Sequence, residues 1–480
     1  MGSSFVMDFL SNPDNLYLSK DSRMKYWEVG KLLPKDLALY YIEEISFEDK
    51  APRKEALENV LSTMRIEGIN FIYLILGDDK GVHFYYGIAK DLSEDTKLTL
   101  SVSDIGKYVL EPSIKGNFRG SKVNLVNPVE KEAIVSKIDN MRFYSILEGV
   151  PGINKDDEKF QGVDRLVDTM LGDNFGVMII AKPLEYDEVK EIEKNLYTLY
   201  SRISPLSKKS EQNGSSEGEG ISNSETNGSS VTKGTSTSTA TQTSTQVTHG
   251  TSSGESKSTT KGTNSGSSSN SSSNSGTEGT TTGISDSKAK TEGKTETDGT
   301  SNSSTTQESK TTSSNKNRNK SHSTTMEYVD KEIQDWVKYL DETIIPRLDY
   351  GTGKGVFITS SFLFSDNKAS LMKLENTMKS LYSGEKGNKV PLRTSSITGK
   401  NTSQIKMLKN FQIPFGAFVE NISENELISR SALSQCVDKD KKFYVGNWIT
   451  TNELSMISGL PQKEVVGLTL NEGKRQKIYE

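Results

Sequence analysis

The sequence predicts an α+β fold: two-layer sandwiches of mixed or antiparallel sheet, with helices on one face, interrupted by a long disordered insertion. Three observations support this prediction. Short apolar runs bounded by turn residues alternate with stretches of helical periodicity on both sides of the centre of the chain. The centre itself is almost devoid of apolar residues. The helices predicted on either side of it each carry one apolar stripe.

Residues 1–205 are predicted to form an α/β module. Two apolar runs, 69–76 and 82–89, surround the turn-rich stretch 77–81, which is typical of a β-hairpin. The remaining strands are expected at 98–102, 143–147 and 175–181. Helices are expected at 53–65, 103–110, 130–141 and 163–171.

Residues 326–480 are predicted to form a second α/β module that packs back on the first. A strand at 355–364 and a helix at 368–382 repeat the strand-then-helix order of the first part. Near the C-terminus, Thr450 and Glu453 have the spacing of a capping box, which predicts that a short helix begins there.

Two striped helices border the central tract. Residues 185–204 place their apolar side chains three or four apart, and residues 326–347 do the same. Pro205 and Pro346 are expected to end these helices. The stripes predict an antiparallel helix pair from whose tip the tract emerges, so that the tract is an insertion in one folded unit. The alternative is that each helix packs on its own sheet and that the tract separates two domains.

The central tract, residues 206–325, is a low-complexity sequence of Ser, Thr, Gly, Asn, Lys and Glu. It contains no aromatic residue between Tyr200 and Tyr328. Ordering the backbone costs about 1–2 kcal/mol per residue, and such a composition buries too little apolar surface to offset that cost. We therefore predict that the tract is disordered.

Composition excludes several kinds of site. The single cysteine, Cys436, rules out an internal disulfide or a cysteine-rich zinc site, and only three histidines are present. The net charge of −5 argues against nucleic-acid binding through a basic surface. No apolar run is long enough to span a bilayer and no secretory signal is evident, so we expect a cytoplasmic location.

Residues that could support catalysis are few. His83 lies in a predicted strand, where a packed ring is the simpler interpretation. A carboxylate pair for metal binding or glycoside hydrolysis is conceivable around a glycine-rich stretch, but a solvated loop is the simpler interpretation. These carboxylates are Glu148, Asp156, Asp157, Asp164 and Asp168. We assign no catalytic, cofactor-binding or metal-binding residue, and we expect that this chain alone is not an enzyme.

Three fragments resemble phosphate-binding loops but lack the required spacing. In residues 351–355, Gly355 stands where a Walker loop needs Ser or Thr, and a strand follows where a helix is needed. Residues 383–389 follow a predicted helix, and their glycine is typical of the residue that ends a helix. Residues 399–402 also fail the spacing. We interpret these fragments as turns.

The C-terminal stretch contains the most specific pattern. Residues 451–468 read T-x-E-L-x-x-I-x-x-L-P-x-x-E-V-x-G-L, and this pattern resembles the segment that precedes the motor domain in HerA-like ATP-binding proteins. These proteins belong to the FtsK–HerA superfamily, with the conjugation and type IV secretion ATPases. The stretches F-Q-I-P-F-G at 411–416 and R-S-A-L-S-Q at 430–435 are also similar to that group.

The resemblance implies an N-terminal region whose nucleotide-binding core would follow Leu468. Only residues 469–480 remain, so ATP and magnesium are implied only for a core that this chain lacks, and no catalytic residue is carried over. We therefore expect a non-catalytic accessory region that serves oligomerisation or partner docking, with nucleic acid reached only through the parent motor. The alternative is a stand-alone interaction protein with two binding modules on a flexible tether. A small enzyme built around His83 is the third hypothesis.

Overall fold

The computed structural model describes residues 2–47, 53–152, 162–227, 310–384, 388–397, 403–433, 435, 442–465 and 467–472. The chain divides into two compact units. One unit combines Met1–Ser207 with Asp330–Glu480, and the other is Lys208–Val329. The two flanks of the central tract thus belong to the same unit.

A ten-stranded sheet forms the centre of the first unit, with strand order β11-β6-β10-β7-β3-β4-β2-β15, while β14 pairs with β10 and β5 pairs with β2. The strands are β2 (Leu37–Phe47), β3 (Ile69–Asp78), β4 (Gly81–Lys90), β5 (Lys122–Leu125), β6 (Phe143–Glu148), β7 (Phe175–Pro183), β10 (Val356–Ser365), β11 (Arg393–Ile397), β14 (Asn447–Thr450) and β15 (Thr469–Glu472). Among these described strands, only the pair β15 and β2 is parallel. The predicted α+β class with a mixed or antiparallel sheet is confirmed.

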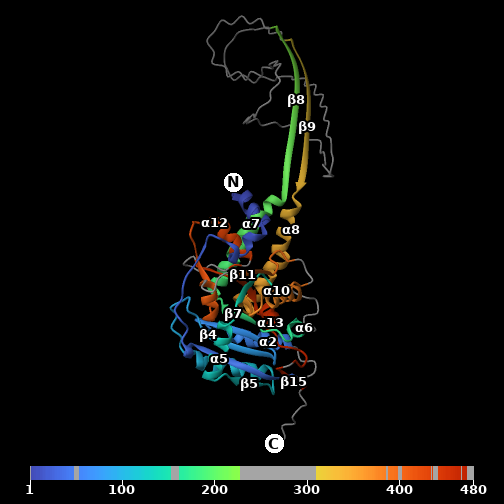
Figure 1. Ribbon diagram of the computed structural model, residues 1–480. Coiled ribbons are helices and arrows are strands. Elements are labelled where there is room, and N and C mark those ends of the chain that lie inside the picture. Colours follow the sequence, from blue (N-terminus) through green and yellow to red (C-terminus); the bar gives the residue numbers. More distant parts are fainter. Residues whose placement is uncertain are drawn as a thin grey trace, which may run out of the picture. The chain divides into compact units, whose positions relative to one another are not determined.

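Strand β10 joins the two flanks of the tract. Phe362 of β10 lies opposite Ile146 of β6 on one side and opposite Met178 of β7 on the other. A strand from the C-terminal flank therefore lies between two strands from the N-terminal flank. Figure 1 labels β7 of the N-terminal flank, which pairs with β10, and β11 of the C-terminal flank, which belongs to the same sheet.

The sheet has a hydrophobic core on each face, whereas the sequence predicted helices on one face only. Along β3, Ile72 and Leu74 face the first core while Phe71 and Tyr73 face the second. Because the strand is apolar on both sides, both of its faces must be covered. Short apolar runs cannot show this by periodicity alone.

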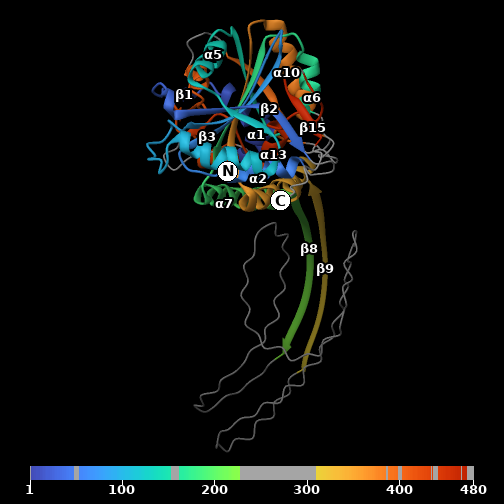
Figure 2. The same ribbon diagram turned by 90° about the horizontal axis from the view of Figure 1, so that it is seen from below.

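Different helices cover the two faces. The first core receives side chains from α1 (Gly2–Ser11), α5 (Pro128–Asp139), α7 (Tyr186–Ile203), α8 (Lys331–Tyr339), α9 (Ile345–Lys354), α11 (Ser403–Lys409) and α12 (Glu424–Leu433). The second core receives side chains from α2 (Arg53–Thr63), α3 (Val102–Ile105), α4 (Glu111–Asn117), α6 (Gly162–Met170), α10 (Lys368–Tyr382) and α13 (Thr451–Ile457). Helices α6 and α10 lie side by side on the second face (Figure 2).

Most predicted helices and strands are present, including both striped helices. Helix α7 begins with a capping box at Glu185 and buries its stripe, and α8 is capped by Asp330. Helix α7 contacts α8 and α9, but it also lies against α12 and α1. The two stripes therefore share the first core with further helices. The capping box at Thr450 is also confirmed.

Two local predictions are wrong. Pro346 does not end a helix: a π-helical turn, η7 (Leu340–Ile344), precedes it, and α9 continues to Lys354. The wider turn at η7 accommodates the proline ring, which an α-helical turn would force against a carbonyl group. Residues 98–102 do not form a strand; Ser101 instead caps helix α3.

Shorter elements complete the first unit. A three-stranded sheet contains β1 (Met24–Tyr26), β12 (Phe415–Phe418) and β13 (Phe443–Tyr444). The single-turn helices are η1 (Pro13–Leu16), η2 (Leu18–Lys20), η3 (Pro34–Asp36), η4 (Gly106–Leu110) and η6 (Ser204–Ser207).

The second unit contains an antiparallel pair of long strands. These are β8 (Lys208–Asn227) and β9 (Lys310–Val329). Residues 228–309, the larger part of the tract predicted as disordered at 206–325, lie outside the described residues. Among the helices that the structure describes, none is both long enough and apolar enough to cross a membrane.

Candidate functional site

A polar hollow of about 460 Å³ opens between helix α1, helix α12 and the segment that follows α1. We call this segment, residues 12–23, the N-terminal strap. The hollow is lined by Phe9, Asp14, Asn15, Lys20, Asp21, Ser22, Arg23 and Glu426. Most of its walls are therefore charged or hydrogen-bonding side chains.

The strap folds as two single helical turns. The Asn12 side chain accepts a hydrogen bond from the Asp14 N–H at 3.2 Å, and Pro13 supplies the fixed backbone angle that suits the start of η1. Leu16, Tyr17 and Leu18 are buried in the first core. This burial holds the strap against the body while the polar side chains on either side of it line the hollow.

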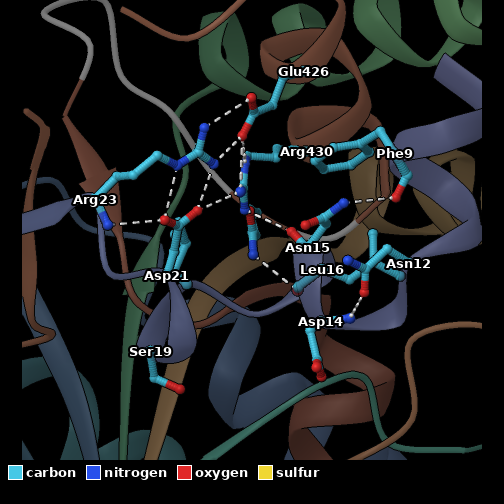
Figure 3. A network of polar contacts seen from close by, with 12 residues as sticks. Phe9, Asn12, Asp14, Asn15, Leu16, Ser19, Asp21, Arg23, Glu426 and Arg430 are labelled. Atoms are coloured by element: carbon cyan, nitrogen blue, oxygen red, sulfur yellow. Dashed lines mark hydrogen bonds and ion pairs between the residues drawn. The ribbon is translucent and has the colours of Figure 1, made fainter. Parts of the chain in front are cut away.

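Arg430 of α12 forms hydrogen bonds to the strap and to residues that line the hollow (Figure 3). Its side chain is fully buried, and it donates to the Asn15 carbonyl and to Asp21 Oδ2, both at 2.7 Å. It also donates to Glu426, one turn earlier on α12, at 2.9 Å, and to Gln435 Oε1 at 2.9 Å. A buried guanidinium with this many acceptors determines the geometry around it.

Arg23 completes a ring of two guanidinium groups and two carboxylates. It donates to Asp21 Oδ2 at 2.7 Å and to Glu426 Oε1 at 2.6 Å. Burial alone would raise the pKa of Asp21, but the hydrogen bonds from Arg23 hold that pKa below its ordinary value. Asp21 therefore stays ionised at neutral pH and is a poor general acid.

Other side chains of the body hold the backbone of the strap. Glu148, at the end of β6, accepts hydrogen bonds from the N–H groups of Leu18 at 3.2 Å and Ser19 at 3.1 Å. Gln435 Nε2 donates to the Leu16 carbonyl at 2.8 Å. Burial raises the pKa of Glu148 to about 7, although the hydrogen bonds from Ser19 and Leu18 act against this rise.

The rim of the hollow is more exposed than its floor. The side chain of Asp14 is 63% exposed, that of Lys20 37% and that of Arg23 35%. Asp14 also pairs with Arg393 of β11 at 2.6 Å. The rim therefore presents negatively and positively charged side chains to a molecule that enters the hollow. Arg430 holds the buried carboxylates beneath them. Such an arrangement suits binding of a polar segment.

A second buried polar cluster surrounds Lys182 of β7. Its Nζ lies 2.9 Å from Asp91, 3.2 Å from the Tyr444 hydroxyl and also beside Glu94. Burial alone would lower the pKa of Lys182, but Asp91 and its other partners raise it above its ordinary value. A lysine held in its charged form is a poor base, so we assign this cluster a structural role.

The residues considered for catalysis from the sequence do not come together. His83 is half-buried, its Nδ1 lies 3.4 Å from the Tyr41 hydroxyl, and burial lowers its pKa. Asp164 accepts hydrogen bonds from two backbone N–H groups of the segment after α13, at Gln462 and Lys463, both at 2.8 Å. Glu148 instead contacts the strap, and Asp168 is exposed.

Several residues named in the sequence analysis lie outside the described residues: Asp156, Asp157, Cys436, 385–387 and 399–402.

The fragment 351–355 is the end of α9, where the Gly355 N–H donates to the Gly351 carbonyl at 2.7 Å. Gly355 has φ of +130°, which favours glycine. This fragment is therefore the last turn of α9, whereas the sequence predicted a turn that follows a helix end at Pro346.

The three stretches that carry the family resemblance all bind distant parts of the chain. In the stretch 411–416, Gln412 accepts a hydrogen bond from the Leu92 N–H at 2.8 Å and donates one to the Lys90 carbonyl at 2.9 Å. The second, 430–435, supplies the two side chains that hold the strap. In the C-terminal stretch that ends at Leu468, Glu453 pairs with the buried Arg347 of α9. Their polar groups are thus used inside the fold.

Sequence reasoning missed the ring of two carboxylates and two guanidinium groups that includes Arg430. Asp21 and Arg23 lie about four hundred positions from Glu426, as the separation of 403 between Arg23 and Glu426 shows, so no local pattern links them. The available signal was the pair Glu426 and Arg430, spaced four apart on one helix face.

Among the described residues, no group of three or more His, Cys, Asp or Glu side chains is arranged to hold a metal ion. Comparisons with protein-family models, curated proteins and solved structures gave no match for this chain.

Proposed function

We propose that the chain is a non-catalytic accessory region of a HerA-like ATP-binding motor protein and that the hollow beside the N-terminal strap docks a protein segment. One observation carries the proposal: exposed charged side chains project from the rim of the hollow, and the buried Arg430 holds the segment that carries them through the Asn15 carbonyl and Asp21. A preformed polar surface loses little side-chain freedom when a partner binds.

The stretches that resemble the HerA-like group support the accessory role. Gln412, Arg430, Gln435 and Glu453 all make buried hydrogen bonds or ion pairs between distant segments. These side chains stabilise the fold by linking segments that are far apart in the sequence. ATP and magnesium belong to the core that the resemblance places after Leu468.

The partner is a protein segment that carries both charges, supplied by a second copy of this chain or by another subunit. A basic side chain on that segment would approach Asp14, and an acidic side chain would approach Lys20 and Arg23. Complementary charges at a rim chiefly set specificity and the rate of association.

The alternative is a stand-alone interaction protein. Its version with two separately folded modules on a tether gains no support, because β10 of the C-terminal flank lies between β6 and β7 of the N-terminal flank. A single interaction module that acts outside any motor remains the second candidate.

Self-association is the form of docking that the purified chain can test. We expect sedimentation velocity to show concentration-dependent association, weakened by salt and by Lys20→Glu, which reverses a rim charge without touching Arg430. The matched control is Lys115→Glu, because Lys115 is 49% exposed on α4, a helix that packs in the second core, whereas the helices beside the hollow pack in the first. Equal effects of the two variants would contradict docking at the hollow.

Calorimetric titration with ATP and magnesium tests the accessory role separately. We expect no binding heat from this chain. Tight stoichiometric ATP binding would contradict the proposal that the nucleotide site lies elsewhere.

A further inference from the structure

The strap is held by side chains where a strand would be held by a backbone ladder. The carbonyls of Asn15 and Leu16 accept from Arg430 and Gln435, and the N–H groups of Leu18 and Ser19 donate to Glu148. Besides the burial of Leu16, Tyr17 and Leu18, the attachment of the strap therefore depends on a few polar side chains of the body.

Among these side chains, Glu148 is the one whose charge can change near neutral pH. An arginine keeps its charge over the physiological range and a glutamine does not titrate. Glu148 is 2% exposed, and its carboxyl touches the strap directly. We propose that Glu148 makes the attachment of the strap depend on pH, so that the strap is held more tightly below neutral pH than above it.

The other charged and titratable groups that face Glu148 do not change their charge near pH 7. Arg430 of α12 favours its ionised form, and Arg393 of β11 is its cross-strand neighbour but pairs with Asp14. Tyr17 and Tyr26 also face it, and burial raises the pKa of both, so neither loses a proton near pH 7.

The direction of the pH effect follows from the two environments of the carboxyl. In the closed strap, burial raises the pKa of Glu148 from its ordinary 4.5 to about 7, whereas in an open strap the carboxyl meets water. The closed state therefore binds the proton more tightly. Its stability is greatest below about pH 4.5, falls as the pH rises, and levels off above about pH 7.

Hydrogen exchange of the strap amides tests the inference in the intact chain. Between about pH 6 and about pH 8.5, the opening constant should rise about tenfold, after correction for the intrinsic exchange rate. Amides of the central strand β3 serve as the internal reference and should show no such rise. A strap whose corrected opening is equal at both pH values would overturn the proposal.

Two variants sharpen the test. Glu148→Gln keeps an acceptor for the two N–H groups but cannot ionise, so its strap should open as rarely at about pH 8.5 as at about pH 6. The matched control is Asp164→Asn, another buried carboxylate that binds two backbone N–H groups, which should leave the wild-type pH dependence of the strap intact. An unchanged pH dependence in Glu148→Gln would also overturn the proposal. The wild-type comparison decides it if that variant does not fold.

Discussion

Strand β10 and the N-terminal strap both connect the two flanks of the chain, but different interactions hold them. Strand β10 forms backbone ladders with β6 and β7, and its side chains alternate between the two cores. The strap has two short helical turns, and its backbone is held by Glu148, Arg430 and Gln435. We therefore expect loss of β10 to disrupt the sheet, and we expect opening of the strap to leave the ladders of the sheet paired.

The largest expected effect is a loss of stability caused by a substitution in β10. Phe362 is fully buried in the first core, and Phe362→Ala should lower the free energy of unfolding by about 4 kcal/mol, because a large cavity remains. Denaturant unfolding measures this loss. Phe143→Ala on neighbouring β6, where the side chain is 36% exposed, should cost far less. Similar losses in both variants would contradict the central position of β10.

The next effect breaks the strap. Arg430→Met removes a buried cation and leaves two buried carboxylates with fewer partners, so we expect a loss of about 3 kcal/mol. Hydrogen exchange should locate the loss in the strap and α12. Arg23→Met should cost less because the Arg23 side chain is 35% exposed and Arg430 remains in place. The reverse order would show that Arg23 is the main anchor.

The smallest effect sharpens the comparison. Gln435→Leu removes the donor to the Leu16 carbonyl and one acceptor of Arg430, so it should cost about 1 kcal/mol. Exchange of the strap amides should accelerate while β3 stays protected. A global loss of protection would show that the strap and the sheet open together.

Periodicity and turn chemistry predicted much of the fold. The stripe of α7, the hairpin of β3 and β4, the helix α10 and the capping box at Thr450 each follow from a local pattern. Helices on both faces of the sheet were not predicted, because a buried apolar run shows neither which face it presents nor how many faces are covered.

The candidate site could hardly be predicted at all. Leu16 and Leu18 lie in separate single helical turns and Tyr17 lies between them, so neither the helical nor the strand period applies. The ring of Asp21, Arg23 and Arg430 forms only when α12 packs beside the strap. Such contacts depend on tertiary structure, and only the stretch 430–435 was recognised in the sequence, through its resemblance to a family.

The position of β10 has a consequence for synthesis on the ribosome. Strands β6 and β7 both pair with β10, and residues 356–365 are translated only after the entire Ser/Thr-rich tract. A nascent chain that has just reached residue 207 therefore holds two strands with the place between them unfilled. Because unpaired edges of this kind are prone to pair with other strands, we expect the nascent chain to be most prone to association before residues 356–365 have emerged.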